Sequence, residues 1–323
     1  MSQLDARRGR VLVTGASGFI GRDLSCRLAG VGWHVRAAAR DTSALPVVAG
    51  IEPAHLADLA APTDWTVLLE GVTHVVHLAG IAHATSTIPA ATYHAVNAEA
   101  VGSLARAAAI AGIRRVVLMS SIRAQCGASA DGVVDEHRPA SPDDDYGRAK
   151  LAGEKLLAEA LAGSGTTWTT LRPVLVYGPG VKGNMAALAR LARRRLPLPI
   201  GGLTARRSLL GLDNLAGAVE HALVGDRVSG STFLLADPGA LTVPQIVTAM
   251  REGLGRAPGI VSIPLSPLRF AAALAGRRAA WQRIAGDLVV STAALEATGW
   301  RPRTSARDGI TQWMRDAGQF AGA

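Results

Sequence analysis

Short apolar runs alternate with longer amphipathic segments through the first half of the chain. Residues 11–13 are apolar at every position, which is typical of a strand buried on both faces of a sheet. Helix-compatible spacing follows from Phe19 to Leu28, and further strands are predicted at 33–39, 54–59, 74–78 and 115–119, with an alanine-rich helix at 97–111. This alternation predicts an α/β fold with a doubly wound parallel sheet rather than a barrel.

Three glycines, Gly15, Gly18 and Gly21, stand between the first strand and the first helix, in the stretch TGASGFIG. Glycine allows a tight turn and the close approach of another backbone, and the free amides and positive dipole end of a helix suit a pyrophosphate. The context of strand, glycine turn and helix therefore predicts a dinucleotide site. The alternative is a glycine turn that serves packing alone.

The ends of the next strands bear on the choice of cofactor, because the carboxyl ends of parallel strands meet at one edge of the sheet. Arg40 ends the second strand, where an acidic residue would bind the 2′-hydroxyl of NAD and an arginine would accept the 2′-phosphate of NADP. The sequence therefore favours NADP, with NAD as the alternative, and Arg40 could also be a surface arginine beside Asp41. Asp58, after the third strand, is placed to accept a hydrogen bond from the adenine amino group.

The chemistry is predicted where a long irregular loop, 127–145, runs into a helix that extends to about Leu161. Tyr146 and Lys150 are four residues apart and share one face of that helix. A free phenol is a poor acid or base at neutral pH, but an ammonium one turn away and a cationic nicotinamide favour the phenolate and lower its pKa. Ser121, after the fifth strand, would hold the substrate oxygen. The alternative is an incidental tyrosine and lysine at helical spacing.

Composition narrows the function classes. The chain has 323 residues, 49% of them hydrophobic, and a formal net charge of +9 that is carried almost entirely by scattered arginine. The arginine run 193–195 has no interleaved aromatic residues, so we expect no nucleic-acid partner. Cys26 and Cys126 have no CxxC spacing and no histidine cluster, which indicates a reducing compartment and no metal site.

We expect neither a signal peptide nor a membrane span, and therefore a cytoplasmic protein, because the only apolar run near the N-terminus is strand-length. The segment 267–281 could form a basic amphipathic helix on a membrane surface, but docking against the body of the protein is the favoured interpretation.

Taken together, TGASGFIG, the strand end at 77–79, Asn97, the run at 119–121 and YGRAK resemble the extended branch of the short-chain dehydrogenase/reductase superfamily, the NAD-dependent epimerase/dehydratase family. The resemblance implies a Rossmann fold with a smaller, mostly helical substrate lobe. It also implies a catalytic triad of Ser121, Tyr146 and Lys150, with Lys150 holding the nicotinamide ribose. The implied cofactor-binding residues are Gly15, Ser17, Gly18, Phe19, Ile20, Gly21, Arg40, Asp58, Leu59, Leu78, Ala79, Gly80, Asn97, Tyr146, Lys150 and Pro173.

We divide the chain into a dinucleotide-binding domain, 1–172, to which 208–236 returns, and a substrate-binding lobe, 173–207 and 237–323. Helices flanking the Tyr146 helix make a dimer in many members of the superfamily, so a homodimer is a further expectation. The stretch VRAAARD, with Arg40, is similar to members of the dihydroflavonol-reductase type that use NADP.

The second half of the chain resembles enzymes that act on UDP-N-acetylated hexoses in bacterial surface polysaccharide synthesis, including 4-ketoreductases that make UDP-N-acetylquinovosamine. The likeness rests on LRPVLVYGPGVKGN (171–184) and on 196–199, 206–209 and 213–215. The candidate substrate residues are Ser121, Arg123, Asn184, Leu198 and Arg207.

A helix start near Asn184 and the charge of Arg207 suit a second diphosphate, and the Leu198 run offers backbone groups to a base. The alternatives are a helix cap for Asn184 and a surface charge at a strand edge for Arg207. Arg123 stands where the 4-epimerases have Tyr-Gly, so the contacts to the sugar must differ there.

The leading hypothesis is an NAD(P)-dependent oxidoreductase that reduces a 4-keto group on a UDP-linked hexose. A UDP-sugar 4-epimerase would use the same residues in both directions and is the nearest alternative. A reductase of small non-nucleotide ketones and a cofactor-sensing binding protein are the others.

Overall fold

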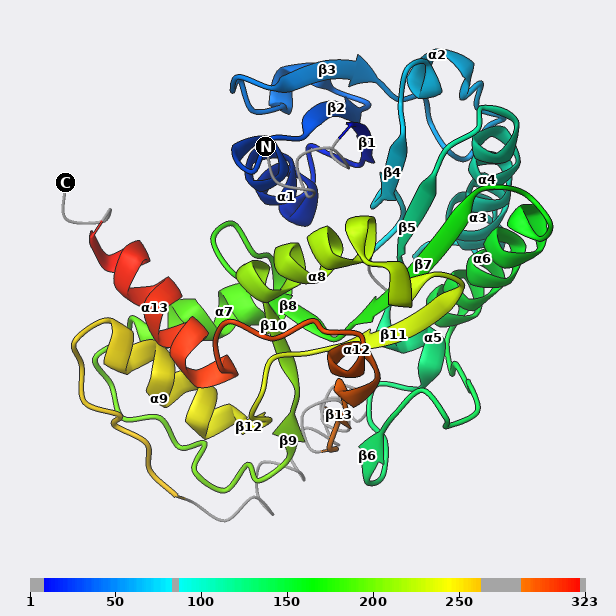
Figure 1. Ribbon diagram of the computed structural model, residues 1–323. Helices are drawn as coiled ribbons and strands as arrows, with labels where there is room; N and C mark the ends of the chain where they lie inside the picture. Colours follow the sequence, from blue (N-terminus) through cyan, green and yellow to red (C-terminus); the bar gives the residue numbers. More distant parts are fainter. Residues whose placement is uncertain (1–8, 83–86, 263–285, 320–323) are drawn as a thin grey trace.

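The computed structural model describes residues 9–82, 87–262 and 286–319. A seven-stranded parallel sheet in the order β11-β7-β5-β4-β1-β2-β3 forms its centre (Figure 1). The strands are β1 (Arg10–Thr14), β2 (His34–Ala39), β3 (Ile51–His55), β4 (His74–His77), β5 (Arg115–Met119), β7 (Thr167–Pro173) and β11 (Ser231–Leu235). The chain leaves β1 toward β2 and β3, then crosses to β4 on the other side, which confirms the doubly wound α/β fold.

Alternate residues of each strand enter two different cores. Val11 and Val13 pack with helices α1 (Phe19–Gly30) and α8 (Leu212–Val224), whereas Leu12 packs on the other face with α2 (Thr66–Leu69), α4 (Ala100–Ile110) and α6 (Asp145–Leu161). Each fully buried valine or leucine side chain contributes about 1.5–3 kcal/mol of hydrophobic free energy. Burial on both faces explains why the central strands read as continuous apolar runs.

A third core lies away from the sheet, among the helices α7 (Gly183–Ala192), α9 (Val243–Gly253) and α13 (Ala306–Gln319), which Figure 1 shows grouped together. It is made by Met185, Ile246, Met250, Ile310 and Met314, among others. The division of the chain into two domains at the stated residues stays a prediction.

The remaining elements are short. They are the 3₁₀ turns Thr42–Ala44 and Asp226–Val228, α3 (Ala90–His94), the π-helical turn Ala95–Glu99, α5 (Ile122–Gln125), β6 (Val133–Val134), β8 (Leu175–Tyr177), β9 (Arg206–Arg207), β10 (Leu209–Gly211), β12 (Leu241–Thr242), β13 (Val289–Val290) and α12 (Ala293–Ala297).

The third strand differs from the prediction, which placed it at 54–59. It runs from Ile51 to His55, so Asp58 and Leu59 lie in the turn beyond it. Glu52 and Pro53 are exposed, and β3 pairs with β2 alone. An edge strand tolerates a proline and exposed polar residues, which hide it from an apolar pattern.

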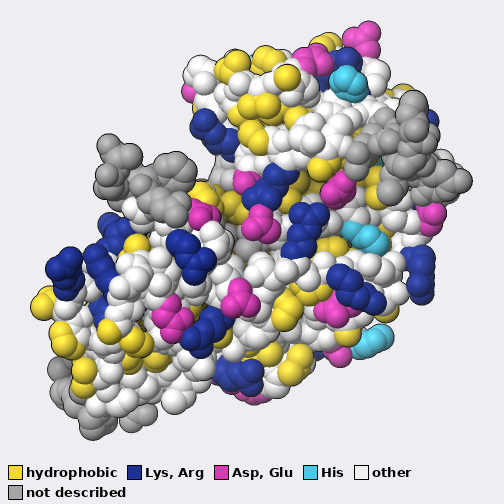
Figure 2. Space-filling model, turned by 60° about the vertical axis from the view of Figure 1, so that its left-hand side comes forward, with side chains coloured by type: hydrophobic (Ala, Val, Ile, Leu, Met, Phe, Trp, Pro, Cys, Tyr) yellow, Lys and Arg dark blue, Asp and Glu magenta, His cyan; other side chains and the backbone are white. Residues whose placement is uncertain are grey.

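The predicted helix 97–111 also begins differently, because a π-helical turn with Asn97 at its centre precedes α4. The segment 267–281 lies outside the described residues. Within the parts of the chain that the structure describes, no helix has the length and apolar character needed to cross a membrane. On the face shown in Figure 2, Lys and Arg side chains are interspersed with Asp and Glu rather than gathered in one patch.

Helix α6 approaches the π-helical turn closely enough to require a glycine. A Cβ atom at Gly153 would lie 2.2 Å from the carbonyl oxygen of Asn97, which is backbone and has no room to move away. Because α6 carries Tyr146 and Lys150, this contact positions the helix that holds two of the predicted catalytic residues.

We therefore expect Gly153→Ala to lower the free energy of unfolding by about 1–3 kcal/mol, the usual cost of overpacking. Thermal unfolding followed by circular dichroism would show a lower Tm. Gly30→Ala is the matched control, since Gly30 also lies in a helix but has nothing within 4 Å of the position of its Cβ, and its Tm should be unchanged or slightly higher. Equal Tm values for the two variants would contradict this account of the packing.

Candidate active site

The glycine turn between β1 and α1 packs directly against the end of β4. Gly15 has φ +69°, and a Cβ there would lie 2.8 Å from the amide nitrogen of Ala79. A Cβ at Gly21 would lie 2.2 Å from the carbonyl oxygen of Gly15. Gly18 is the N-cap of α1, and no side chain caps the first turn, which holds Phe19, Ile20 and Gly21.

This turn opens between β1 and β4, the point where the strand order reverses and where open parallel sheets bind ligands. Ser17 and Gly18 are exposed there. Uncapped amides at the start of a long helix suit a pyrophosphate, so the residues present fit a dinucleotide.

Two buried residues, Thr14 and His77, support the turn from beneath. The Thr14 hydroxyl accepts a hydrogen bond from the Ala79 amide at 3.2 Å and lies 2.9 Å from Nδ1 of His77. Burial, together with the nearby Lys150 ammonium, lowers the pKa of His77 to about 3, so the imidazole is neutral. Sequence reasoning did not assign these two residues a role, although a histidine within the apolar run 74–78 was a visible signal.

Asn97 holds the loop that follows β4. Its Oδ1 accepts from the Ile81 amide at 2.9 Å, and its Nδ2 donates to the Ile81 carbonyl at 3.1 Å. A Cβ at Gly80 would lie 2.6 Å from Asn97 Oδ1 and 3.3 Å from Lys150 Nζ. The backbone of Gly80 therefore packs against the Lys150 ammonium. Contact of Asn97 with a cofactor stays a prediction.

The three predicted catalytic residues come together at the end of β5. The Ser121 hydroxyl lies within hydrogen-bonding reach of the Tyr146 phenol, and Lys150 Nζ donates to the Met119 carbonyl at 3.1 Å. All three side chains are buried. Burial lowers the pKa of Lys150 to about 8, with Glu154 acting in the opposite direction.

The expectation that Lys150 and a cationic nicotinamide together lower the pKa of Tyr146 stays a prediction, because it depends on the bound cofactor. The pKa of Tyr146 is raised, because burial removes water from the phenolate, and the hydrogen bond from Ser121 and the charge of Arg123 only partly compensate. Tyr146 therefore keeps its proton at neutral pH in the protein without cofactor.

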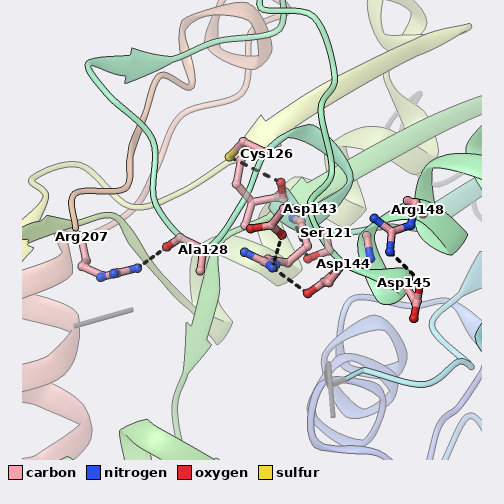
Figure 3. A network of polar contacts seen from close by, with 11 residues as sticks. Ser121, Cys126, Ala128, Asp143, Asp144, Asp145, Arg148 and Arg207 are labelled. Carbon is pink, nitrogen blue, oxygen red and sulfur yellow. Dashed lines mark hydrogen bonds and ion pairs between the residues drawn. The ribbon is translucent and has the colours of Figure 1, made fainter. Parts of the chain in front are cut away.

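The start of α6 is fixed by contacts with α5. Asp144 caps α6 by accepting from the Gly147 amide at 2.7 Å, and a Cβ at Gly147 would lie 2.2 Å from the Arg123 carbonyl oxygen. Arg123 Nη2 also donates to Asp143 and Asp144, at 2.6 Å each. Figure 3 shows the carboxylates of Asp143 and Asp144 pointing toward one guanidinium, so two ion pairs hold Arg123 at the start of α6.

Two of the predicted contacts to the adenosine end, Arg40 and Asp58, are exposed. Arg40 directly follows β2 and makes no hydrogen bond or ion pair with the described residues. The Asp41 carboxylate instead accepts from the amide and hydroxyl of Ser43, at 2.9 and 2.6 Å. Asp58 accepts from the Ala60 amide at 3.0 Å, and Leu59 beside it is buried.

Two further predicted cofactor contacts lie at the ends of their strands. Leu78 is half-buried directly after β4, and Pro173 is buried at the end of β7.

The structure changes the interpretation of three candidate substrate residues. Asn184 is exposed in the first turn of α7, where Lys182 is the N-cap, so Asn184 is not a helix cap. The backbone of Leu198 is already paired, because its amide donates to Gly259 at 2.9 Å and its carbonyl accepts from the amides of Ile200 and Val261, each at 2.9 Å. Contact of the run 196–199 with a base stays a prediction.

Arg207 is half-buried rather than a free surface charge. Its guanidinium donates to the carbonyls of Ala128 and Gly286, at 2.8 Å each, and burial lowers its pKa (Figure 3). It therefore ties the loop 127–145 to the segment at 286–288. A cavity of about 350 Å³ lies between these two segments, lined in part by Gln125, Cys126 and Asp287. Among the residues described, no group of three His, Cys, Asp or Glu side chains could hold a metal ion.

We expect Gly15→Ala to weaken dinucleotide binding by about tenfold or more, because relieving the clash with Ala79 displaces the turn at a cost of about 1–3 kcal/mol. Calorimetric titration with NAD and NADP would measure it. Gly112→Ala is the control, because Gly112 has a similar φ, +67°, but nothing within 4 Å of the position of its Cβ. A Gly15→Ala protein that binds as tightly as the Gly112→Ala protein would overturn the assignment of this turn.

Comparisons with known proteins agree with this geometry. The chain is 30% identical over 316 residues to a UDP-glucose 4-epimerase of Vibrio cholerae, covering 94% of this chain and 93% of the relative. It is 28% identical over 313 residues to a dTDP-6-deoxy-L-talose 4-dehydrogenase (NAD(P)(+)) of Kitasatospora kifunensis, covering 94% of each.

A solved structure of MoeE5 in complex with UDP-glucose and NAD superposes with a TM-score of 0.76 at 25% identity, covering 97% of this chain and all of that one. Finally, residues 11–236 match the model of the NAD dependent epimerase/dehydratase family, and this span holds the glycine turn and the serine, tyrosine and lysine. The chain is therefore an enzyme of the NAD dependent epimerase/dehydratase family, as the resemblance of its motifs implied.

Proposed function

We propose that this enzyme reduces a 4-keto group on a UDP-linked hexose with NADPH. The observation that carries the proposal is the arrangement of Ser121, Tyr146 and Lys150 beside the dinucleotide turn, with a phenol that retains its proton. Reduction of a ketone needs a proton donor at the oxygen, and Tyr146 is protonated beside Ser121; in this proposal the bound cationic nicotinamide and Lys150 lower its pKa toward the working range.

The residues divide the work as follows. Ser121 orients the substrate oxygen by a hydrogen bond, and Tyr146 gives it a proton. The Lys150 ammonium, one helical turn along α6, stabilises the phenolate that results. A bound nicotinamide supplies the hydride. The turn at Gly15 to Gly21 and the exposed Arg40 are the groups of this chain that would hold the dinucleotide.

The preference for NADP rests on the end of β2. Arg40 is exposed and unpaired among the described residues, and Asp41 is occupied by Ser43, so a positive charge rather than a free carboxylate faces the ribose position. NADPH is the form that suits net reduction. Solved relatives contain NAD, so the choice needs a direct test.

For the substrate, we propose that α7 receives the diphosphate. Its first turn has no side-chain cap, and Asn184 is exposed in it. The complexes of MoeE5 with UDP-glucose and with UDP-glucuronic acid support a nucleotide sugar. Arg123, Leu198 and Arg207 are proposed to border the sugar and the base, with Arg207 acting through the loop that it holds.

A UDP-sugar 4-epimerase is the second candidate, and the relative from Vibrio cholerae favours it. The test is incubation with UDP-glucose and UDP-N-acetylglucosamine without added cofactor, and separately of the corresponding 4-keto sugars with NADPH. Reduction of the keto sugar with no 4-epimer in the first incubation is expected. Appearance of the 4-epimer would replace the reductase with the epimerase.

A reductase of small non-nucleotide ketones is separated from both by a thermal-shift titration with UDP. We expect UDP to raise the Tm, since a ligand that binds only the folded state stabilises it. An unchanged Tm would favour the small-ketone reductase.

Tyr146→Phe and Lys150→Met should each lower kcat by about 10²–10⁴-fold, the usual contribution of a positioned acid or base. Lys155→Met is the matched control, because Lys155 is on the same helix but exposed. It should turn over like the parent. Comparable rates for Lys150→Met and Lys155→Met would remove the lysine from the mechanism.

Arg40→Ala should raise the Kd for NADPH by about tenfold or more, because a hydrogen bond to a charged phosphate contributes about 1.5–3 kcal/mol. The Kd for NADH should change little, which fluorescence titration of the two cofactors would show. Arg106→Ala, at an exposed position on α4, is the control. Equal losses for NADPH and NADH would refute the role of Arg40 in selecting the 2′-phosphate.

A further inference from the structure

Behind the catalytic residues lies an ion pair that the reaction itself does not use. Glu154 on α6 and Arg172 on β7 have side chains only 7% and 10% exposed. Arg172 Nε donates to both carboxylate oxygens of Glu154, at 2.9 and 3.1 Å, and its Nη2 donates to one of them as well. A buried ion pair of this kind rarely adds net stability over apolar residues of the same size. The groups that Glu154 and Arg172 contact therefore matter more than the stability of the pair itself.

One end of the pair contacts the segment that carries the catalytic serine. The Ser120 hydroxyl donates to Glu154, and Ser120 directly precedes Ser121. Glu154 also lies one helical turn beyond Lys150 on the same helix. The carboxylate thus joins the helix of Tyr146 and Lys150 to the end of β5.

The other end contacts the helix that Ser121 begins. Arg172 Nη1 donates to Gln125 Oε1, and Gln125 is the last residue of α5, whose N-cap is Ser121. With its oxygen held in this way, Gln125 donates through Nε2 to the Arg138 carbonyl in the loop 127–145. Ser121 is therefore held on both sides, through Ser120 and through α5, by the same ion pair.

Glu154 also affects the protonation of Lys150. The carboxylate of Glu154 opposes the effect of burial on the pKa of Lys150. His77, from β4, also faces Lys150, but it is neutral because its own pKa is about 3. The groups that face Tyr146 are Asp144, Arg123 and Tyr93, from the start of α6, from α5 and from α3.

We propose that Glu154, with Arg172, is a positioning residue of this active site, which sets Ser121 against Tyr146 and keeps Lys150 in its ammonium form. The effect on turnover rests on the function proposed above, whereas the effect on Lys150 is a property of the protein without substrate. The two can therefore be tested separately.

The charge is tested by Glu154→Gln, which keeps an oxygen for Ser120 but removes the negative charge. The chain has three lysines, so a protein labelled with ¹³C at lysine Cε gives three signals, and Lys150→Met assigns the one from Lys150. Its titration midpoint, about 8 in the parent, should fall by about one pH unit in Glu154→Gln, since an opposite charge has been removed. Loss of kcat on the alkaline side should begin at a correspondingly lower pH.

The position is tested by Glu154→Asp, which keeps the charge and shortens the side chain. The Lys150 midpoint should stay near that of the parent, while kcat falls by about tenfold or more at every pH, with KM little changed, because Ser121 is displaced. If Glu154→Gln fails to fold, Glu154→Asp and Arg172→Lys, which both keep their charge, still test the position: kcat should fall in each while the Lys150 midpoint stays near that of the parent.

Glu159→Gln is the matched control, an exposed glutamate on the same helix, and it should leave both the midpoint and kcat unchanged. The proposal is overturned if the Lys150 midpoint in Glu154→Gln equals that of the parent, or if kcat in Glu154→Asp equals that of the parent. Failure of the proposed function would appear differently, as a parent protein that shows the Lys150 titration but turns over no UDP-linked sugar.

Discussion

The candidate active site depends on three close contacts between backbone segments, each of which leaves no room for a side chain and is made by a glycine. Gly15 lies against Ala79, Gly147 against the carbonyl of Arg123, and Gly153 against the carbonyl of Asn97. The first contact shapes the dinucleotide turn, and the other two set α6 against α5 and against the π-helical turn. A methyl group at any of the three would move a catalytic element, because backbone cannot rotate away as a flexible side chain can.

Burial has opposite consequences for the two central titratable groups. It raises the pKa of Tyr146 and lowers that of Lys150, since in each case the charged form loses water. The protein therefore provides a phenol that keeps its proton and an ammonium whose pKa, about 8, is close to neutral pH. Glu154 is the group that offsets this cost for Lys150, and the neutrality of His77 avoids adding to it.

Sequence reasoning succeeded where function requires short, local patterns. The glycine turn, the Tyr146 and Lys150 spacing and the helix that begins near Asn184 each involve residues within one or two turns of one another. It could not identify partners that are distant in the chain. The backbone of Leu198 pairs with Gly259 and Val261, and Arg207 donates to Ala128 and Gly286, none of which the local pattern reveals. The roles of both residues toward a substrate stay predictions.

The same limit explains other differences. Pro53 argues against a strand in the sequence, because a proline fits a strand only at the edge of a sheet. Which strand is at the edge follows from the arrangement of the whole sheet, not from the local pattern. The bond between Glu154 and Arg172 joins a helix to a strand, so helical spacing does not predict it. The sequence shows the charge next to Tyr146 but not the loss of water, which raises its pKa in the protein without cofactor.

The separate core of α7, α9 and α13 has a consequence for how such a protein can diversify. In the function proposed above, α7 receives the diphosphate of the substrate, so substitutions among those helices would alter contacts with the substrate while the glycine contacts and the pair of Glu154 and Arg172 are left untouched. On that proposal, selection for a new sugar can act on one group of helices without disturbing Ser121, Tyr146 and Lys150, and ligand preference becomes the property that changes most readily.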